Sequence, residues 1–178
     1  MASVDTALRD APTVNLPGLG RALISAGKLT QQAAEELVRK ARSAKTDFIA
    51  EVTGSGAVSS SDLAYTVASI FSAPLLDLDA IDPSRLPRDL LDVKFCKTYR
   101  VLVLSKRNNR LILATADPTD HEAAEKIKFT TQLGVDWVIT EYDKLSKLVE
   151  AMGKAAAELE DTSASDFAEF EFEDIPED

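Results

Sequence analysis

Residues 19–30, with the sequence LGRALISAGKLT, recur in degraded form as residues 48–59, FIAEVTGSGAVS. The offset of 29 residues is constant, so Gly27 corresponds to Gly56 and Leu29 to Val58. Self-similarity at a fixed period indicates tandem structural units, and a single helix-turn-helix unit of this length cannot bury its apolar face alone. The repeat therefore predicts two helical units packed together. The surface shared by the two units favours a binding function over a catalytic one.

Each unit has the features of a short helix followed by a longer one. In the first unit, Gly27 is placed to end a helix in left-handed backbone, and Thr30 is placed to cap the next helix. Apolar residues then recur at helical spacing from Ala33 to Ala41. Ser59 takes the capping position in the second unit. These signals predict a helical tandem-repeat subdomain over residues 16–74, after a flexible N-terminus at residues 1–15.

The hydrophobic period changes from helical to extended in the second half. Two strands with a turn between them are expected at 99–104 and 110–115, and a third strand is expected at 136–140. A helix opened by a capping box of Thr119 and Glu122 should connect the last two strands as a right-handed crossover, which makes them parallel. The sequence thus predicts an α+β fold whose mixed-sheet subdomain (β-β-α-β-α, residues 93–154) follows a connector at 75–92.

Acidic residues are concentrated at the C-terminus. The chain has a net charge of −10, and residues 158–178 hold ten acids and no Lys or Arg. The body is therefore neutral, which argues against nucleic-acid binding because phosphate neutralisation supplies most of that affinity. Residues 155–178 are expected to form a largely disordered acidic linker. Phe167, Phe170 and Phe172 within it fit a docking motif or a plain linker equally well.

The sequence offers few groups for catalysis or metal binding. Its single cysteine, Cys96, is expected to be a buried structural thiol, and its single histidine, His121, to be an exposed residue at a helix start. Asp117, Thr119 and Asp120 resemble a site, but a strand end and a helix cap explain all three. No phosphate-binding glycine-lysine motif is present. We expect no catalytic residue, no metal and no cofactor in this chain.

No apolar run approaches the ~20 residues that span a bilayer, and the N-terminus lacks a basic-then-apolar signal pattern. We therefore expect no direct membrane insertion and a cytoplasmic location.

Three stretches of the second half carry a resemblance: residues 99–104 (YRVLVL), 109–120 (NRLILATADPTD) and 127–134 (IKFTTQLG). Together with the helical repeat, over residues 16–152, they resemble the N-terminal domain of the secretion and pilus assembly ATPases, the general secretory pathway protein E family, and most of all the type IV pilus extension ATPases. The resemblance implies a non-catalytic regulatory piece of a hexameric motor at the inner face of the bacterial inner membrane, near platform components of the pilus machinery. ATP and Mg²⁺ would be used by a motor domain beyond this chain. The oligomeric state of the piece alone stays open.

Some members of this family bind cyclic di-GMP through an Arg-Leu-Gly pattern in each helical unit, and the match here is partial. The residues that fit this degenerate motif are Leu19, Gly20, Leu23, Gly27 and Gly56. The arginine positions hold Gly18 and Asp47, and the distal glutamine positions hold Ala41 and Ile70. The pattern has thus lost its charge-assisted contacts.

Two functions follow from this resemblance. The first is docking of a PilZ-type adaptor protein on the first repeat, through the apolar residues Leu16, Leu19, Leu23 and Ile24, which are expected to be exposed, with Arg21 at the rim. The alternative is a sensor that binds cyclic di-GMP directly.

Overall fold

The computed structural model of the protein describes residues 14–168. Its elements run in the order α1 (Gly18–Ser25), α2 (Gln31–Ala44), α3 (Phe48–Gly54), α4 (Ser60–Phe71), two 3₁₀ turns, η1 (Leu78–Ala80) and η2 (Pro83–Arg85), α5 (Val93–Tyr99), β1 (Val101–Arg107), β2 (Arg110–Thr115), α6 (His121–Thr131), β3 (Gly134–Ile139) and α7 (Tyr142–Ala168).

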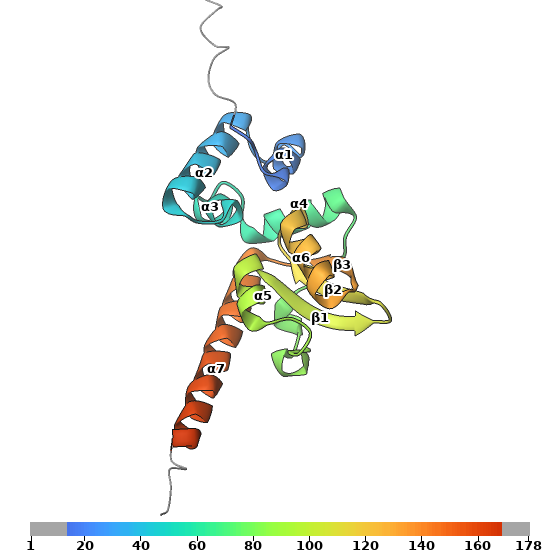
Figure 1. The fold of residues 1–178 in the computed structure, drawn as a ribbon. Coiled ribbons are helices and arrows are strands. Elements are labelled where there is room, and N and C mark those ends of the chain that lie inside the picture. Colours follow the sequence, from blue (N-terminus) through green and yellow to red (C-terminus); the bar gives the residue numbers. More distant parts are fainter. Residues whose placement is uncertain (1–13, 169–178) are drawn as a thin grey trace, which may run out of the picture.

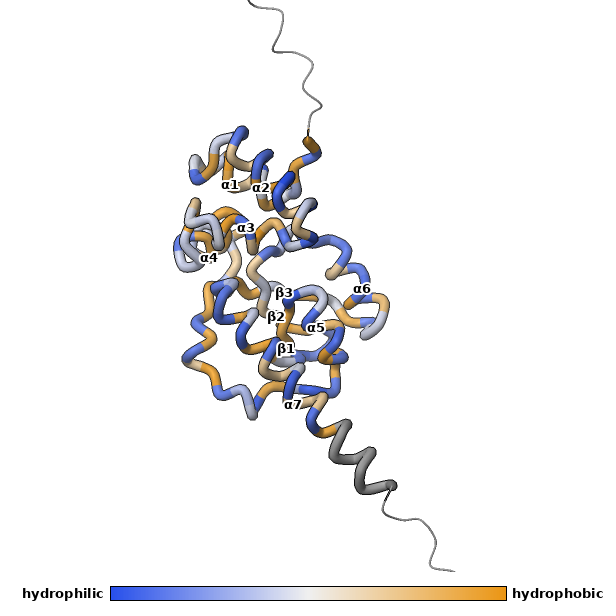
Figure 2. Tube along the Cα trace, turned by 90° about the vertical axis from the view of Figure 1, so that its left-hand side faces the viewer, coloured by the Kyte–Doolittle hydropathy of each residue, from blue (hydrophilic) through white to orange (hydrophobic). Residues whose placement is uncertain are grey.

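Helices α1–α4 form one half of the body, and the sheet with α5, α6 and the start of α7 forms the other (Figure 1). The two repeats exchange contacts, because α1 packs against α4 and α2 against α3. Helix α4 also contacts β3 and α7, which joins the halves. Helix α7 leaves the body on the side away from α1–α3 (Figures 1 and 2). The expected α+β architecture is confirmed.

The sheet has the strand order β1-β2-β3. Strands β1 and β2 form an antiparallel hairpin, and β2 pairs with β3 in parallel, from Arg110 opposite Gly134 to Thr115 opposite Ile139. The predicted crossover through α6 is therefore confirmed. The connector extends the pairing at the end of β3, where Leu76 N donates to the Ile139 carbonyl oxygen at 2.8 Å and Ile139 N donates to the Pro74 carbonyl oxygen at 2.8 Å.

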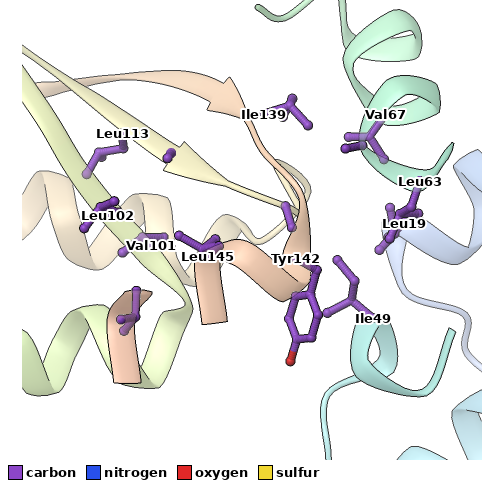
Figure 3. Close-up of a cluster of buried hydrophobic side chains, with 14 of the residues drawn as sticks. Leu19, Ile49, Leu63, Val67, Val101, Leu102, Leu113, Ile139, Tyr142 and Leu145 are labelled. Atoms are coloured by element: carbon purple, nitrogen blue, oxygen red, sulfur yellow. The ribbon is translucent and has the colours of Figure 1, made fainter. Parts of the chain in front are cut away.

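One hydrophobic core runs through both halves. On the helical side it contains Leu19, Leu63 and Val67, and on the sheet side Leu102 and Leu113, all of them buried. Ile49, Ile139 and Tyr142 are buried between the two sets (Figure 3). Because the apolar faces of both repeats join the sheet's core, the helical half is held against the sheet by burial rather than by a flexible link.

Besides shifts of one to three residues at the ends of β1 and β3, the structure differs from the sequence expectations at three places in the second half. Residues 93–99 form α5, so Tyr99 ends a helix instead of starting a strand. The cap is Asp92, whose side chain accepts from Lys94 N at 3.0 Å. The second difference is the cap of α6, which is Asp120 accepting from Ala123 N at 2.9 Å. Thr119 instead donates both its N–H and its hydroxyl to Asp117, so the Thr119–Glu122 capping box is wrong.

The third difference concerns the C-terminal boundary. Helix α7 continues through Ala168, so residues 155–168 are not the disordered linker that the acidic composition suggested. The run from Lys154 to Leu159 is rich in Ala, Glu and Leu, which are strong helix formers. The remaining residues of the expected linker, with Phe170 and Phe172, and the first thirteen residues of the expected flexible N-terminus lie outside the described residues.

Candidate functional site

The two repeats share the same backbone frame. Gly27 and Gly56 both have positive φ, at 68° and 73°, a conformation that costs L-residues with a side chain about 1 kcal/mol. Thr30 and Ser59 cap the helices that follow, and their side chains accept from Ala33 N at 3.2 Å and from Asp62 N at 3.1 Å. The duplication seen in the sequence is therefore structural at its turns and its caps.

The two positions that precede the repeats differ in their surroundings. A Cβ atom at Gly18 would lie 2.8 Å from Thr119 Cβ, closer than real side-chain atoms approach. Thr119 is therefore packed where an arginine of the first repeat would begin. Asp47 occupies the equivalent place in the second repeat, where it is exposed and precedes α3 without a side-chain capping hydrogen bond.

The partner-contact residues expected from the first repeat are not all at the surface. Leu19 and Leu23 have 0% exposed area, so the expectation that they are exposed is wrong. Both point into the core because α1 packs against α4 and α2. Leu16 and Ile24 are half-buried, and Arg21 is exposed. The motif residue Gly20 is also buried, and a Cβ there would lie 3.3 Å from the Phe48 ring.

A groove of about 390 Å³ lies between the segment before α1, the end of α2 and the start of α3. We call it the N-terminal groove, and its lining residues are Asn15, Leu16, Pro17, Val38, Ala41, Arg42, Lys45, Thr46 and Phe48. Leu16 and Phe48 supply half-buried apolar surface, while Arg42 and Lys45 are exposed. Arg42 also donates to the Asn15 carbonyl oxygen at 3.5 Å. The groove thus combines an apolar floor with a cationic side.

A second pocket, of about 160 Å³, lies where the two halves meet. We call it the junction pocket, and its lining residues are Asp47, Phe48, Ile49, Thr98, Tyr99, Arg100, Thr115, Ala116, Asp117, Asp120 and Tyr142. It draws on the start of α3, the ends of α5 and β2 and the start of α7. No local pattern in the sequence indicated that these segments meet. Asp117 and Asp120 were explained by a strand end and a cap, and only the topology brings Asp47 beside them.

Arg100 connects this pocket to α7. Its Nη1 donates to Glu150 Oε1 at 2.8 Å, and Lys97 Nζ lies 3.0 Å from Glu150 Oε2. Partial burial alone would lower the pKa of Arg100, but the hydrogen bond to Glu150 and the nearby charge of Asp47 raise it. Arg100 is therefore charged and fixed by its ion pair with Glu150, and Glu150 pairs with two cations, Arg100 and Lys97.

Among the carboxyl groups of the junction pocket, Asp117 has a pKa that burial shifts. Burial raises its pKa above the usual value of 3.8, against the opposing effect of the hydrogen bonds from Thr119, and the neighbouring charge of Asp120 raises it further. Both Thr119 hydrogen bonds end on Oδ1, at 2.9 Å from the amide and 2.6 Å from the hydroxyl. The carboxylate is thus costly to charge in its present surroundings.

The single cysteine, Cys96, and the single histidine, His121, do not line either pocket. Cys96 is 5% exposed, and burial, with the negative charge of Asp92, raises the pKa of its thiol to about 11. The thiol is therefore protonated at neutral pH and a poor nucleophile. His121 is the exposed first residue of α6. Within residues 14–168 no group of three or more His, Cys, Asp or Glu side chains is arranged to hold a metal ion.

None of the helices in the described part of the chain is both long enough and apolar enough to cross a bilayer.

Comparisons with known proteins place the fold in a family. Residues 71–159 match the model of the MshEN domain. The chain is 33% identical over 132 residues to the type IV pilus assembly ATPase PilB of Acinetobacter baylyi, a match that covers 74% of this chain and 23% of the relative. It is 29% identical over 146 residues to PilB of Pseudomonas aeruginosa, covering 82% of this chain and 26% of the relative. The chain thus spans about a quarter of the length of these curated relatives.

Two solved structures share the fold. The N-terminal domain of XpsE superposes with a TM-score of 0.58 at 25% identity, covering 74% of this chain and 91% of that one. MshE, solved with cdg, superposes with a TM-score of 0.55 at 23% identity, covering 75% and 96%. The chain belongs to the MshEN domain family and is homologous to the N-terminal domain of the type IV pilus assembly ATPase PilB.

Proposed function

We propose that this domain is a non-catalytic regulatory module of a type IV pilus assembly ATPase, and that its helical half docks a PilZ-type adaptor protein. ATP hydrolysis, with Mg²⁺, belongs in this proposal to a motor domain of a longer, hexameric protein. That motor works at the inner face of the bacterial inner membrane, against platform components of the pilus. The proposal rests on the homology to PilB and on the state of the two repeats.

The observation that carries the proposal is the contact between Gly18 and Thr119. An arginine at position 18 would have to displace Thr119, since even a Cβ would lie 2.8 Å from it. In the second repeat the equivalent side chain is the carboxylate of Asp47, which repels phosphate. The repeats have thus kept their caps, turns and packing while lacking both guanidinium groups that would bind a nucleotide phosphate or guanine. Two repeats that keep this backbone but lack the arginine side chains favour a protein ligand over a nucleotide.

The N-terminal groove is the surface we assign to the adaptor. It offers apolar area from Leu16 and Phe48 beside the exposed cations Arg42 and Lys45. Protein interfaces combine a few apolar anchors with a polar rim in this way. Of the contacts expected from the sequence, Leu16 lines this groove. Arg21 and Ile24 lie outside its lining and stay in the proposal as flanking contacts, while Leu19 and Leu23 act only through the core.

The test is a calorimetric titration of the domain with the PilZ-domain protein of the source bacterium. We expect Leu16→Asp to weaken binding at least about tenfold, because it removes an apolar anchor. Lys28→Glu is the matched control: Lys28 is an exposed cation in the turn after α1 and is not among the lining residues of the groove. Both variants are first compared with the unmodified domain by thermal melting. Unchanged affinity for a folded Leu16→Asp variant contradicts the assignment of the groove.

The second candidate is direct binding of cyclic di-GMP. It is favoured by the shared fold with MshE, which was solved with cdg, and by the retained motif residues Leu19, Gly20, Leu23, Gly27 and Gly56. Equilibrium dialysis of the domain with cyclic di-GMP at physiological salt separates the candidates. Saturable binding in the micromolar range without any adaptor supports the sensor, and its absence together with adaptor binding supports docking.

A further inference from the structure

The junction pocket has the size of a site for one side-chain head group. Its volume of about 160 Å³ is well below the roughly 300 Å³ at which pockets begin to hold drug-sized ligands. Its walls come from both halves of the body, through Asp47 and Phe48 on one side and Arg100, Asp117 and Tyr142 on the other. A group bound there would contact both halves at once.

Negative charge dominates this pocket. Asp47, Asp117 and Asp120 line it against the single cation Arg100, and the guanidinium of Arg100 is already engaged by Glu150 at 2.8 Å. A carboxylate in partly desolvated surroundings gains from a cation brought beside it. The burial that raises the pKa of Asp117 therefore favours a cationic occupant and disfavours an anionic one.

The carboxylates have acceptor capacity to spare. Both hydrogen bonds to the Asp117 side chain end on Oδ1, and the hydrogen bond to the Asp120 side chain from Ala123 N also ends on Oδ1. Within the described residues, no hydrogen bond reaches Oδ2 of either residue, and the Asp47 side chain makes no capping hydrogen bond. A planar donor with several N–H groups can use such separated oxygens, as a guanidinium does with carboxylates elsewhere.

Aromatic rings complete the walls. Phe48 and Tyr142 line the pocket beside the carboxylates, and Tyr142 is 9% exposed. The third ring, Tyr99, already has Lys126 Nζ at 5.1 Å from its centroid and packs against Phe95 at 4.6 Å. Phe48 and Tyr142 are thus the rings available to a guanidinium plane, which stacks on aromatic faces more readily than an ammonium does.

From this combination we infer that the junction pocket binds the guanidinium group of an arginine side chain from a protein partner. The inserted cation would lie between Asp47 of the helical half and Asp117 of the sheet half. Its charge would also repel Arg100 and so favour the contact of Arg100 with Glu150 on α7. Binding of the partner would in this way strengthen the ion pair that joins Arg100 to α7, the helix that leaves the body.

The test uses two tripeptide probes, N-acetyl-Gly-Arg-Gly-amide and its citrulline counterpart, which has nearly the same shape and no charge. Each is titrated into the ¹⁵N-labelled 178-residue chain at constant ionic strength, and backbone amide shifts are followed by NMR. We expect saturable shifts for Arg100, Ala116 and Asp117 with the arginine peptide, with a dissociation constant in the millimolar range, and none with the citrulline peptide. Equal responses to the two peptides would overturn the inference.

Single substitutions test whether the arginine peptide binds in the junction pocket. Asp117→Asn keeps an acceptor for the Thr119 hydrogen bonds, and Asp47→Asn changes an exposed residue, so at least one of them should keep the fold. Each is expected to weaken the arginine peptide about fivefold or more, while Asp89→Asn, at an exposed connector position, leaves it unchanged. Binding that survives both substitutions in folded protein contradicts the site. The experiment contains no adaptor, so its outcome is independent of the proposed docking on the N-terminal groove.

Discussion

Gly18 and Asp47 stand at equivalent positions of the two repeats, yet their neighbours differ. Gly18 is pressed against Thr119 from the sheet half, whereas Asp47 is exposed and lines the junction pocket. The turns and the caps are the same in both repeats, through the positive φ of Gly27 and Gly56 and the side-chain caps Thr30 and Ser59. A duplicated frame can thus be kept by packing and capping while the positions that would contact a ligand diverge. The following predictions test which parts of the two repeats are equivalent.

The largest effect is expected in the core. Leu23 and Val52 are equivalent and both have 0% exposed area. Leu23→Ala should lower the free energy of unfolding by about 2–5 kcal/mol, and Val52→Ala by less, because it removes less apolar volume. Urea denaturation followed by circular dichroism measures both. Arg21→Ala, at an exposed position of the same helix as Leu23, should stay within about 0.5 kcal/mol. Equal losses for Leu23→Ala and Arg21→Ala would show that α1 is not part of the core.

The next largest effect is the loss of stability on replacing Gly18, compared with replacing Gly54. Gly18→Ala should destabilise by roughly 1–3 kcal/mol, since the added methyl group meets Thr119. Gly54→Ala is the matched substitution, because nothing lies within 4 Å of a Cβ there, and it should be neutral or slightly stabilising. Thermal melting of the two variants gives the comparison. A stable Gly18→Ala variant would remove the steric argument against an arginine at this place.

The two caps should be nearly equal. Thr30→Ala and Ser59→Ala each remove one side-chain acceptor from a helix start, so each should cost about 1 kcal/mol. Urea denaturation again measures both. A large inequality would mean that one unit of the duplication depends on its cap more than the other, against the shared frame.

The smallest effect is one of pH and concerns Asp117, which lines the junction pocket together with Asp47. Burial raises the pKa of Asp117 above 3.8 in the folded chain, so the folded state binds more protons between 3.8 and that raised pKa. The free energy of unfolding therefore falls as pH rises through this window. Asp117→Asn cannot ionise, so it should be more stable than the unmodified domain at pH 7, with the difference closing as pH is lowered towards 3.8.

Urea titrations at several pH values follow this difference. Asp89→Asn reports the effect of removing one negative charge at an exposed place. A difference that is the same at every pH would show that Asp117 is not perturbed by its surroundings.

Local signals in the sequence were enough for the repeat and for the sheet topology. Gly27, Thr30 and Ser59 act through contacts within a few residues, and the span of β2, Arg110–Thr115, agrees with its apolar pattern. Helix α5 was missed because its seven residues carry too short a pattern, and because its cap, Asp92, is the last residue of a proline-marked connector. Helix α7 runs further than expected because alanine-rich propensity outweighs local negative charge.

The sites were harder to predict than the elements. From the sequence alone, the apolar side chains of Leu19 and Leu23 could belong to a binding surface or to the core. The packing of α1 on α4 and α2 shows that they are core residues. The junction pocket unites residues from Asp47 to Tyr142. Such long-range juxtaposition depends on how the halves pack, which no local pattern in one sequence contains.

The two edge strands of the sheet, β1 and β3, are protected from further strand pairing in different ways. Strand β1 has an irregularity between Val103 and Ser105 and ends in the exposed cations Lys106 and Arg107. At the end of β3, the backbone of Pro74 and Leu76 already takes both hydrogen bonds of Ile139. Bulges, charges and covered backbone are the means by which open sheets avoid recruiting strands from other molecules. Copies of this domain crowded side by side would therefore resist merging into a continuous intermolecular sheet.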